Sequence, residues 1–343
     1  MKTNKIIEVC IWILVLMSLI SGMFYFTNGR NWISYKKPVA SRSTAGLNEM
    51  KRETADISKI DQIELRLKDA DVVINSVEGN EIEVIEYARD NDEEELFEMT
   101  QKGDTLKFER KNDEHFGFFF GDNGVQHYVE VKLPKDFSKH LVIENSSGDV
   151  ALVDSFVFDE LELGTTSGNI AINEVEAECE IGATSGDIYI EKISGSEHNI
   201  GATSGKITVK NGVGNLNLGT SSGDIFIEKL EASKVDIGAT SGNITLKEIQ
   251  GDLEIGTTSG NIFIETVEGE EHEIECTSGN VKIEEGKGDF QIETTSGDVF
   301  LKKVNGSKHQ ITTTSGDIDI EEGKGDFDTD TNSGDVRKEN ITE

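Results

Sequence analysis

The chain has 343 residues, of which 66 are Asp or Glu and 33 are Lys or Arg, so its formal net charge is −33. This charge argues against a nucleic-acid partner, because a protein that binds DNA or RNA needs a basic surface to displace condensed counterions. Three cysteines cannot form a disulfide framework in a chain of this length.

The first apolar block runs from Val9 to Phe26 and contains no charged residue. As a helix, a block of this length extends over about 27 Å, which matches the hydrocarbon core of a bilayer. A cleaved signal peptide is the alternative, but its apolar core is usually shorter and ends at a small-residue site. Ser18, Ser21 and Gly22 form only a weak site of this kind. We therefore predict an N-terminal transmembrane anchor over residues 1–27.

A basic segment follows the anchor, and residues 28–56 are predicted to form a juxtamembrane linker. The stretch from Arg30 to Arg52 is either a solvated linker or a segment that lies on anionic lipid. More basic residues follow the anchor than precede it, which by the positive-inside rule favours a cytoplasmic repeat region. Long domains translocate largely regardless of flanking charge, however, so the rule leaves the orientation open.

Residues 57–143 contain several short segments in which apolar and polar residues alternate, which is typical of β-strands. Examples are IleGluLeuArgLeu at 63–67 and TyrValGluValLysLeuPro at 128–134. We predict a β-rich region that caps the N-terminal end of the repeats described next. Its aromatic cluster is a candidate partner contact if exposed, and partly core if it alternates in a hairpin. The cluster consists of Phe116, Phe118, Phe119 and Phe120.

A tandem repeat fills residues 144–336. Ser-Gly pairs begin at Ser147, Ser167, Ser185, Ser204, Ser222, Ser241, Ser259, Ser278, Ser296, Ser315 and Ser333. After a first interval of 20 residues, the spacing alternates strictly between 18 and 19, which suggests a paired unit of 37 residues. Self-similarity at such a period indicates a solenoid. Residues 337–343 remain as a polar tail.

Each repeat reads as one turn, or rung, of a β-solenoid. In the rung that starts at Ser185, Ile188 and Ile190 alternate with polar residues, and Ile200 and Ala202 do so again later. Equivalent aliphatic residues recur in every rung and would stack into ladders that bury a common core. The fold class predicted is therefore an all-β solenoid of about ten rungs. In the last rung, Asp328 to Thr331 replace apolar residues and predict a charged end that opposes edge-to-edge aggregation.

These segments resemble a known bacterial family. AspValValIle at 71–74, ValLysLeuPro at 131–134, LeuValIleGluAsnSerSerGlyAspVal at 141–150 and the tandem ThrSerGly[Asp/Asn] units carry the resemblance. They are similar to the putative-adhesin β-strand-repeat family, a domain of unknown function found in bacterial cell envelopes. The resemblance covers about residues 57–336. It implies a membrane-tethered or secreted envelope protein, in some members linked to envelope stress, and it provides no catalytic residue.

Two polar columns run through the repeats. The residue after each Ser-Gly is Asp or Asn, except at Lys206, and turn chemistry explains this preference. Specific calcium sites would require several oxygen atoms that converge on one point, so we expect only diffuse binding of divalent cations. A Thr column, which includes Thr240 and Thr258, is expected to be an exposed β-ladder rather than a lattice that binds ice or glycan.

Histidines and cysteines also recur in the repeats. His198, His272 and His309 occupy equivalent places in 19-residue units, too far apart to share a metal ion, so we predict structural roles. Cys179 and Cys276 lie five units apart and are predicted to be buried free thiols.

No motif of a hydrolase nucleophile, phosphate loop or zinc enzyme occurs in the sequence. We expect no enzyme, cofactor, catalytic residue or specific metal site. The expected protein is a single-pass envelope protein, with the repeats outside the cytoplasm, that binds an envelope protein or polymer. The alternatives are a cytoplasmic scaffold that regulates a stress-signalling system and a β-helical enzyme that acts on polysaccharide.

Overall fold

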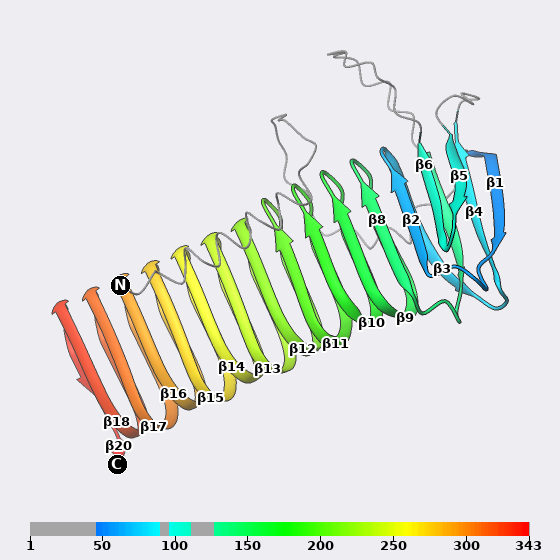
Figure 1. Cartoon of the computed structure of the whole chain (residues 1–343). Coiled ribbons are helices and arrows are strands. Elements are labelled where there is room, and N and C mark those ends of the chain that lie inside the picture. Colours follow the sequence, from blue (N-terminus) through cyan, green and yellow to red (C-terminus); the bar gives the residue numbers. More distant parts are fainter. Residues whose placement is uncertain (1–45, 90–95, 111–126, 343) are drawn as a thin grey trace, which may run out of the picture. The chain divides into compact units, whose positions relative to one another are not determined.

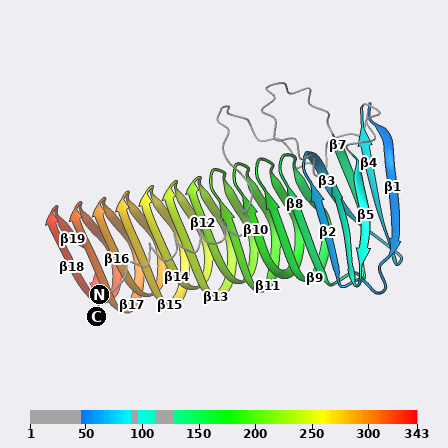
Figure 2. The same ribbon diagram turned by 45° about the horizontal axis from the view of Figure 1, so that its top comes forward.

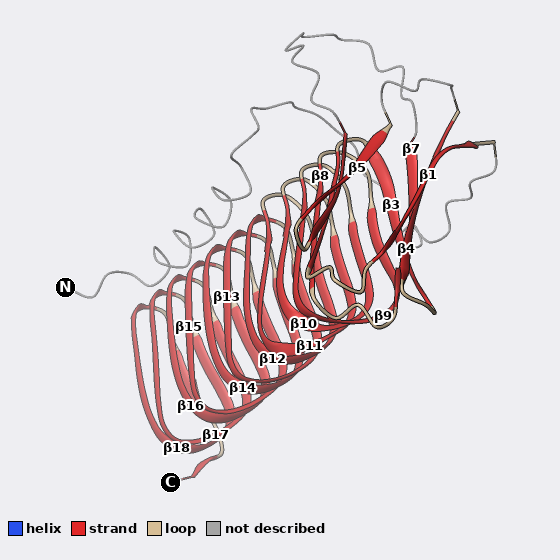
Figure 3. Cartoon of the chain, turned by 45° about the vertical axis from the view of Figure 1, so that its right-hand side comes forward, coloured by secondary structure: helices blue, strands red, loops and turns tan. Residues whose placement is uncertain are grey.

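The computed structural model describes residues 46–89, 96–110 and 127–342, which divide into two compact units, 46–190 and 191–342. Every regular element in these ranges is a β-strand (Figure 3), so the all-β solenoid class is confirmed. The described ranges contain no helix that is long and apolar enough to cross a membrane. The predicted anchor over residues 1–27 and the cluster of Phe116, Phe118, Phe119 and Phe120 lie outside the described residues.

The strands of the first unit are labelled in Figure 1. They are β1 (Asn48–Asp56), β2 (Gln62–Leu67), β3 (Ala70–Val77), β4 (Glu81–Ala88), β5 (Phe97–Lys102), β6 (Thr105–Arg110), β7 (His127–Pro134), β8 (His140–Asn145), β9 (Val150–Thr165) and β10 (Ile170–Ala183). The β-structure thus begins at Asn48, inside the segment predicted as a linker over 28–56. The sequence of β1 lacks an apolar alternation, and its antiparallel pairing with β4 makes it a strand.

The first unit is a partial solenoid with two faces. One face joins β7, β3 and the start of β9 in parallel, and the other joins β6, β2, β8 and the end of β9. β10 follows β9 in parallel along both faces, and these two strands lie side by side in Figure 2. β1, β4 and β5 are antiparallel to their partners. They end the parallel ladders, because an antiparallel strand cannot continue the solenoid winding.

A buried carboxylate joins four strands of this unit. Glu86 on β4 is fully buried, and its side chain accepts the backbone N–H of Phe97 at the start of β5 at 3.0 Å. It also bonds Arg110, the last residue of β6, and His127 Nδ1, the first residue of β7, at 2.8 Å. Burial raises the pKa of Glu86, but the bond from His127 and the charge of Arg110 outweigh it and lower that pKa.

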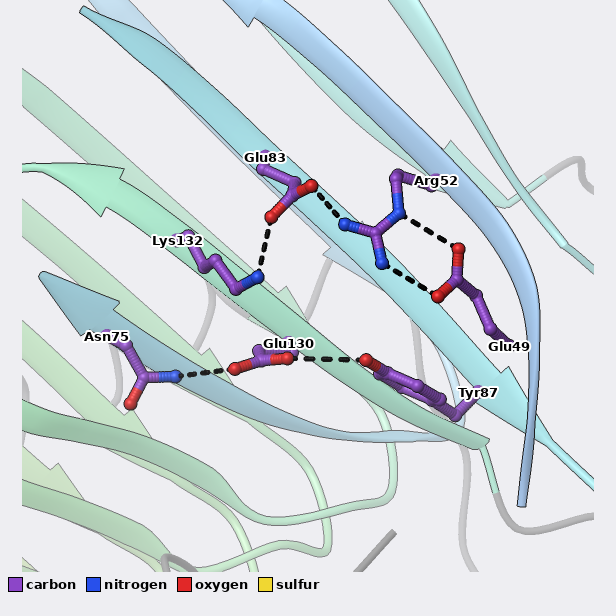
Figure 4. Close-up of polar contacts among 7 residues, drawn as sticks. All are labelled: Glu49, Arg52, Asn75, Glu83, Tyr87, Glu130 and Lys132. Atoms are coloured by element: carbon purple, nitrogen blue, oxygen red, sulfur yellow. Dashed lines mark hydrogen bonds and ion pairs between the residues drawn. The ribbon is translucent and has the colours of Figure 1, made fainter. Parts of the chain in front are cut away.

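Exposed and partly buried polar side chains of β1, β4 and β7 form a network of ion pairs (Figure 4). Arg52 bonds both Glu49 and Glu83, and Lys132 Nζ contacts the other oxygen of Glu83 at 2.6 Å. Because solvent screens these groups, each ion pair contributes little to stability. The network connects the side chains of three neighbouring strands at the surface.

From β12 to β18, the second unit consists of long strands that wind in chain order, one per rung (Figure 1). β11 (Ile188–Ala202) contains the boundary between the units. The strands after it are β12 (Ile207–Ser222), β13 (Ile225–Ser241), β14 (Ile244–Ser259), β15 (Ile262–Ser278), β16 (Val281–Ser296), β17 (Val299–Ser315), β18 (Ile318–Ser333), β19 (Val336–Lys338) and β20 (Ile341–Thr342).

The predicted aliphatic ladders form the core of the rungs. Ile225 pairs with Ile244, which pairs with Ile262, and Val281 continues the same row, all of them buried. The remaining residues that were expected to point inward are buried as well. Parallel in-register pairing places each aliphatic side chain on its equivalent in the next rung, so no rung has to bury its apolar face alone.

The alternation of 18- and 19-residue intervals has its origin at one corner of the rung. Asp252 Oδ1, in an 18-residue rung, accepts the consecutive N–H groups of Glu270 and Glu271 at 2.7 and 3.1 Å. The 19-residue rung carries its extra residue at this corner, where the register shifts by one. Asp289 Oδ1 accepts two consecutive N–H groups in the same way, one paired unit later. In both places, an aspartate of an 18-residue rung therefore binds the backbone of the additional residue in the following 19-residue rung.

The C-terminal end departs from the predicted polar tail. β19 and β20 pair in parallel with β18 and add an incomplete rung to it, so part of residues 337–343 is strand. In β18, Thr329 pairs with Ile311 of the preceding rung. Polar residues thus replace the aliphatic row at this end of the solenoid. Polar side chains on a terminal strand reduce the tendency of that strand to pair with another chain.

Candidate functional site

The second unit carries an open surface groove of about 520 Å³ beside strands β13 to β17. Its polar lining contains five carboxylates, two lysines and two amides, so negative charge predominates. These residues are Asp252, Glu254, Glu271, Glu273, Asp289, Lys234, Lys308, Gln291 and Gln310. Such a surface favours a partner that is positively charged and rich in hydrogen-bonding groups.

The solenoid register builds one wall of the groove. Glu254, Glu273, Gln291 and Gln310 occupy equivalent outward positions of β14 to β17, and each pairs with the next. Rungs in parallel sheets are spaced by about 4.8 Å, so this wall presents oxygen and amide groups at a regular interval. A repeating spacing suits an extended partner that lies along the rungs.

Charges at one end of the groove are partly neutralised. Lys234 Nζ lies 2.9 Å from Asp236 Oδ2 and 3.2 Å from Glu254 Oε2. Burial raises the pKa of Asp236 despite the bond from Lys234. Asp252 and Asp289 behave in the opposite way, since the backbone N–H groups that they accept lower the pKa of both carboxyls.

Two rings of an aromatic ladder, His272 and Phe290, line the groove. His272, Phe290, His309 and Phe327 stack in successive rungs, with ring centroids 4.6, 5.8 and 4.3 Å apart. His272 Nε2 donates to the backbone carbonyl of Lys287 at 3.0 Å, and His309 repeats this bond to Lys324. Burial lowers the pKa of both imidazoles. The rings are buried and hydrogen-bonded to backbone, so they serve the core as predicted and are not placed to act on a bound molecule.

The column of Asp and Asn after each Ser-Gly is a turn ladder. Asn243 N–H donates to Asp224 Oδ1 at 2.9 Å, and the Asn261 N–H donates to Asn243 Oδ1 at 3.1 Å. The same bond recurs along the column, for example from Asp317 to Asp298. In these bonds a carboxylate or amide oxygen of one rung accepts the backbone N–H of the next rung, and this turn chemistry accounts for the residue preference.

The Thr column and the cysteines also lie as expected. Thr240 and Thr258 are exposed on the outer surface of adjacent rungs. Cys179 and Cys276 are buried free thiols, and burial raises the pKa of Cys179 to about 12 and that of Cys276 to about 11. Neither thiol is exposed or acidic enough to act as a nucleophile.

Sequence reasoning did not identify the groove. Its residues come from rungs that are separated by 18 or 19 positions, and only the corner carboxylates repeat at a recognisable interval. One feature of the sequence could have indicated the groove: Asp252 and Asp289 recur at the same place in consecutive 37-residue units.

No curated protein matches the chain. Among solved structures, it is similar to a putative cell adhesion protein from Clostridium sporogenes, at 10% identity and a TM-score of 0.28, covering 69% of this chain and 99% of that one. A putative adhesin from Bacteroides fragilis matches at 12% identity and a TM-score of 0.26, over 84% and 96% of the two chains. A putative adhesin from Parabacteroides merdae matches at 16% identity and a TM-score of 0.25, covering 85% of this chain and 95% of that one.

The family model described as Toastrack DUF4097 matches residues 60–245 and 215–343, which together cover most of the sequence. The resemblance expected from the Leu-Pro strand and the tandem Ser-Gly units is thereby confirmed. The chain belongs to the Toastrack DUF4097 family.

Proposed function

We propose that the chain is a non-enzymatic, membrane-anchored protein of the cell envelope that binds a cationic partner in its acidic groove. The partner is an envelope protein or polymer with positively charged groups at intervals that match the rungs. The observation that carries the proposal is the groove itself, in which five carboxylates face two lysines. The uncharged segment from Val9 to Phe26, which is long enough to span a bilayer as a helix, supports the location.

The binding step is tested with the full-length protein in detergent micelles and a fluorescent oligolysine as a defined cationic probe. The double variant Glu271→Gln/Glu273→Gln removes two negative charges from the groove and is expected to weaken binding about tenfold at low salt. The matched control, Glu248→Gln/Glu265→Gln, removes two exposed charges outside the groove. Equal weakening by both double variants would mean that only net charge attracts the probe.

The location is tested by protease treatment of intact cells, followed by detection of the repeats with an antibody. Loss of the repeat signal, while a cytoplasmic protein survives, is the expected result. Protection of the repeats until the cells are lysed would instead favour a cytoplasmic scaffold. The excess of basic residues after the predicted anchor is the observation that favours this second function.

A further inference from the structure

The first unit brings one histidine and two glutamates together on its outer surface. His140 Nε2 lies 3.0 Å from Glu162 Oε1 and 3.8 Å from Glu160 Oε2, and the three ligand atoms lie within 4.8 Å of one another. His140 begins β8, and the two glutamates lie on β9. Parallel pairing sets His140 opposite Glu160, and Glu162 follows on the same side of the strand.

Negative charge accumulates around this histidine. On β10, Glu178 pairs with Glu160 and Glu180 pairs with Glu162, so four carboxylates occupy two adjacent strands. Burial, followed by the charges of Glu162 and Glu160, raises the pKa of Glu180. Within the described residues, no lysine or arginine forms an ion pair with Glu160 or Glu162.

Other crowded carboxylates of the chain are neutralised by basic side chains. Glu83 has both Arg52 and Lys132, and Glu228 has both Lys210 and Lys247. The neighbour of His140 in sequence, Lys139, pairs with Asp159 instead. His140 is therefore the basic side chain that the structure places beside Glu160 and Glu162.

We propose that His140, Glu160 and Glu162 form a binding site for a divalent transition-metal ion of the zinc type. Zinc bonds of about 2.0–2.2 Å place two tetrahedral ligand atoms about 3.4 Å apart, between the two observed distances from Nε2. The imidazole nitrogen selects zinc over Ca²⁺ and Mg²⁺, which take oxygen ligands. Glu160 is exposed, so water supplies the remaining ligand. This specific site is distinct from diffuse cation binding along the acidic repeats.

The test uses full-length protein in detergent micelles, without a histidine tag and with Cys10→Ser in every variant. Zinc affinity is measured by competition with a fluorescent chelator. His140→Gln and Glu162→Gln are each expected to weaken zinc binding at least about tenfold. The control Glu265→Gln removes one exposed charge in the second unit and is expected to bind as the parent does. Ca²⁺ in large excess is expected to leave zinc bound.

Zinc affinity unchanged by His140→Gln would overturn the proposal, as would displacement of zinc by Ca²⁺ at comparable concentration. Circular dichroism of each variant without metal separates loss of a ligand from loss of folding. A second measurement does not depend on affinity: zinc is expected to raise the thermal midpoint of the parent and not that of His140→Gln. Equal stabilisation of both proteins would also reject the site.

Discussion

At Gly260 the backbone φ is +144°, and a Cβ atom built there would lie 2.0 Å from the carbonyl oxygen of Gly242 in the preceding rung. Gly260→Ala is therefore expected to destabilise the fold by about 2–4 kcal/mol, through backbone strain and a steric clash. Thermal unfolding followed by circular dichroism measures the change. Gly103→Asn is the control, because Gly103 has φ +68° and nothing within 4 Å of its Cβ. An equal loss of stability in both variants would contradict the inference that the close contact between Gly260 and Gly242 requires glycine.

The two buried thiols are expected to react slowly with iodoacetamide. The pKa values raised to about 12 for Cys179 and about 11 for Cys276 leave little thiolate at neutral pH, and burial restricts access. In a Cys10→Ser background, mass spectrometry is expected to show alkylation at least about tenfold slower in native than in denatured protein. Fast labelling of the native protein at Cys276 would show that its rung opens readily.

On the scale of the element, Glu86 connects β4 to β5, β6 and β7. Glu86→Ala would leave Arg110 buried without its carboxylate and is expected to cost about 3 kcal/mol of stability. Urea denaturation monitored by fluorescence measures the free energy of unfolding of each variant and of the parent. Glu49→Ala removes the exposed partner of Arg52 and is expected to change stability little, because solvent screens that pair. If both variants unfolded alike, the buried cluster would not anchor these strands.

The corner carboxylates connect neighbouring rungs of the second unit. Asp289 accepts the N–H groups of Ser307 and Lys308 at 2.6 and 3.1 Å. Asp289→Ala removes both hydrogen bonds and is expected to lower the free energy of unfolding by about 1 kcal/mol. The loss is smaller than for two fully buried hydrogen bonds, because the Asp289 side chain is partly solvated. Asp289→Asn keeps an oxygen acceptor and is expected to retain most of the stability. Hydrogen exchange of the Ser307 and Lys308 amides provides a local measurement, and unchanged protection in Asp289→Ala would contradict the assignment.

On the scale of the whole molecule, stability is expected to fall in mild acid. The buried His272 and His309 have lowered pKa values, so the unfolded chain binds more protons than the folded chain below the ordinary histidine pKa of about 6.5. The contribution of the two neutral histidines to folding stability is complete above pH 6.5. It is lost as the pH falls from that value through their lowered pKa values in the folded protein. The lowered pKa values of Asp252 and Asp289 act in the same direction at still lower pH.

Thermal midpoints measured from about pH 7 to about pH 5 are the test of this pH dependence. The variant His272→Leu/His309→Leu is the comparison, because Leu253 occupies the equivalent position in a neighbouring rung. Its midpoint is expected to depend less on pH than that of the parent, even if it is lower at neutral pH. The same pH dependence in both proteins would assign the acid sensitivity to other groups.

The repeats were predictable because their information is local and periodic. Alternation at Ile225 and Ile227 indicates a strand, and the Ser-Gly interval gives the rung length. The first unit was less predictable. β1 has no apolar alternation, and β2 is inserted between β6 and β8, whose chain positions are far apart. Such pairings depend on contacts between distant segments, which no short window of sequence encodes.

The sequence by itself determined the solenoid, its inward ladders and the buried state of its cysteines, because a strict period repeats the same local preference in every rung. Only the tertiary structure decided which side chains of different rungs meet. The groove around Glu254 and Glu273 and the cluster of His140, Glu160 and Glu162 both depend on register. Register is set by the packing of whole rungs, since a shift by one residue would turn each of these side chains to the opposite face.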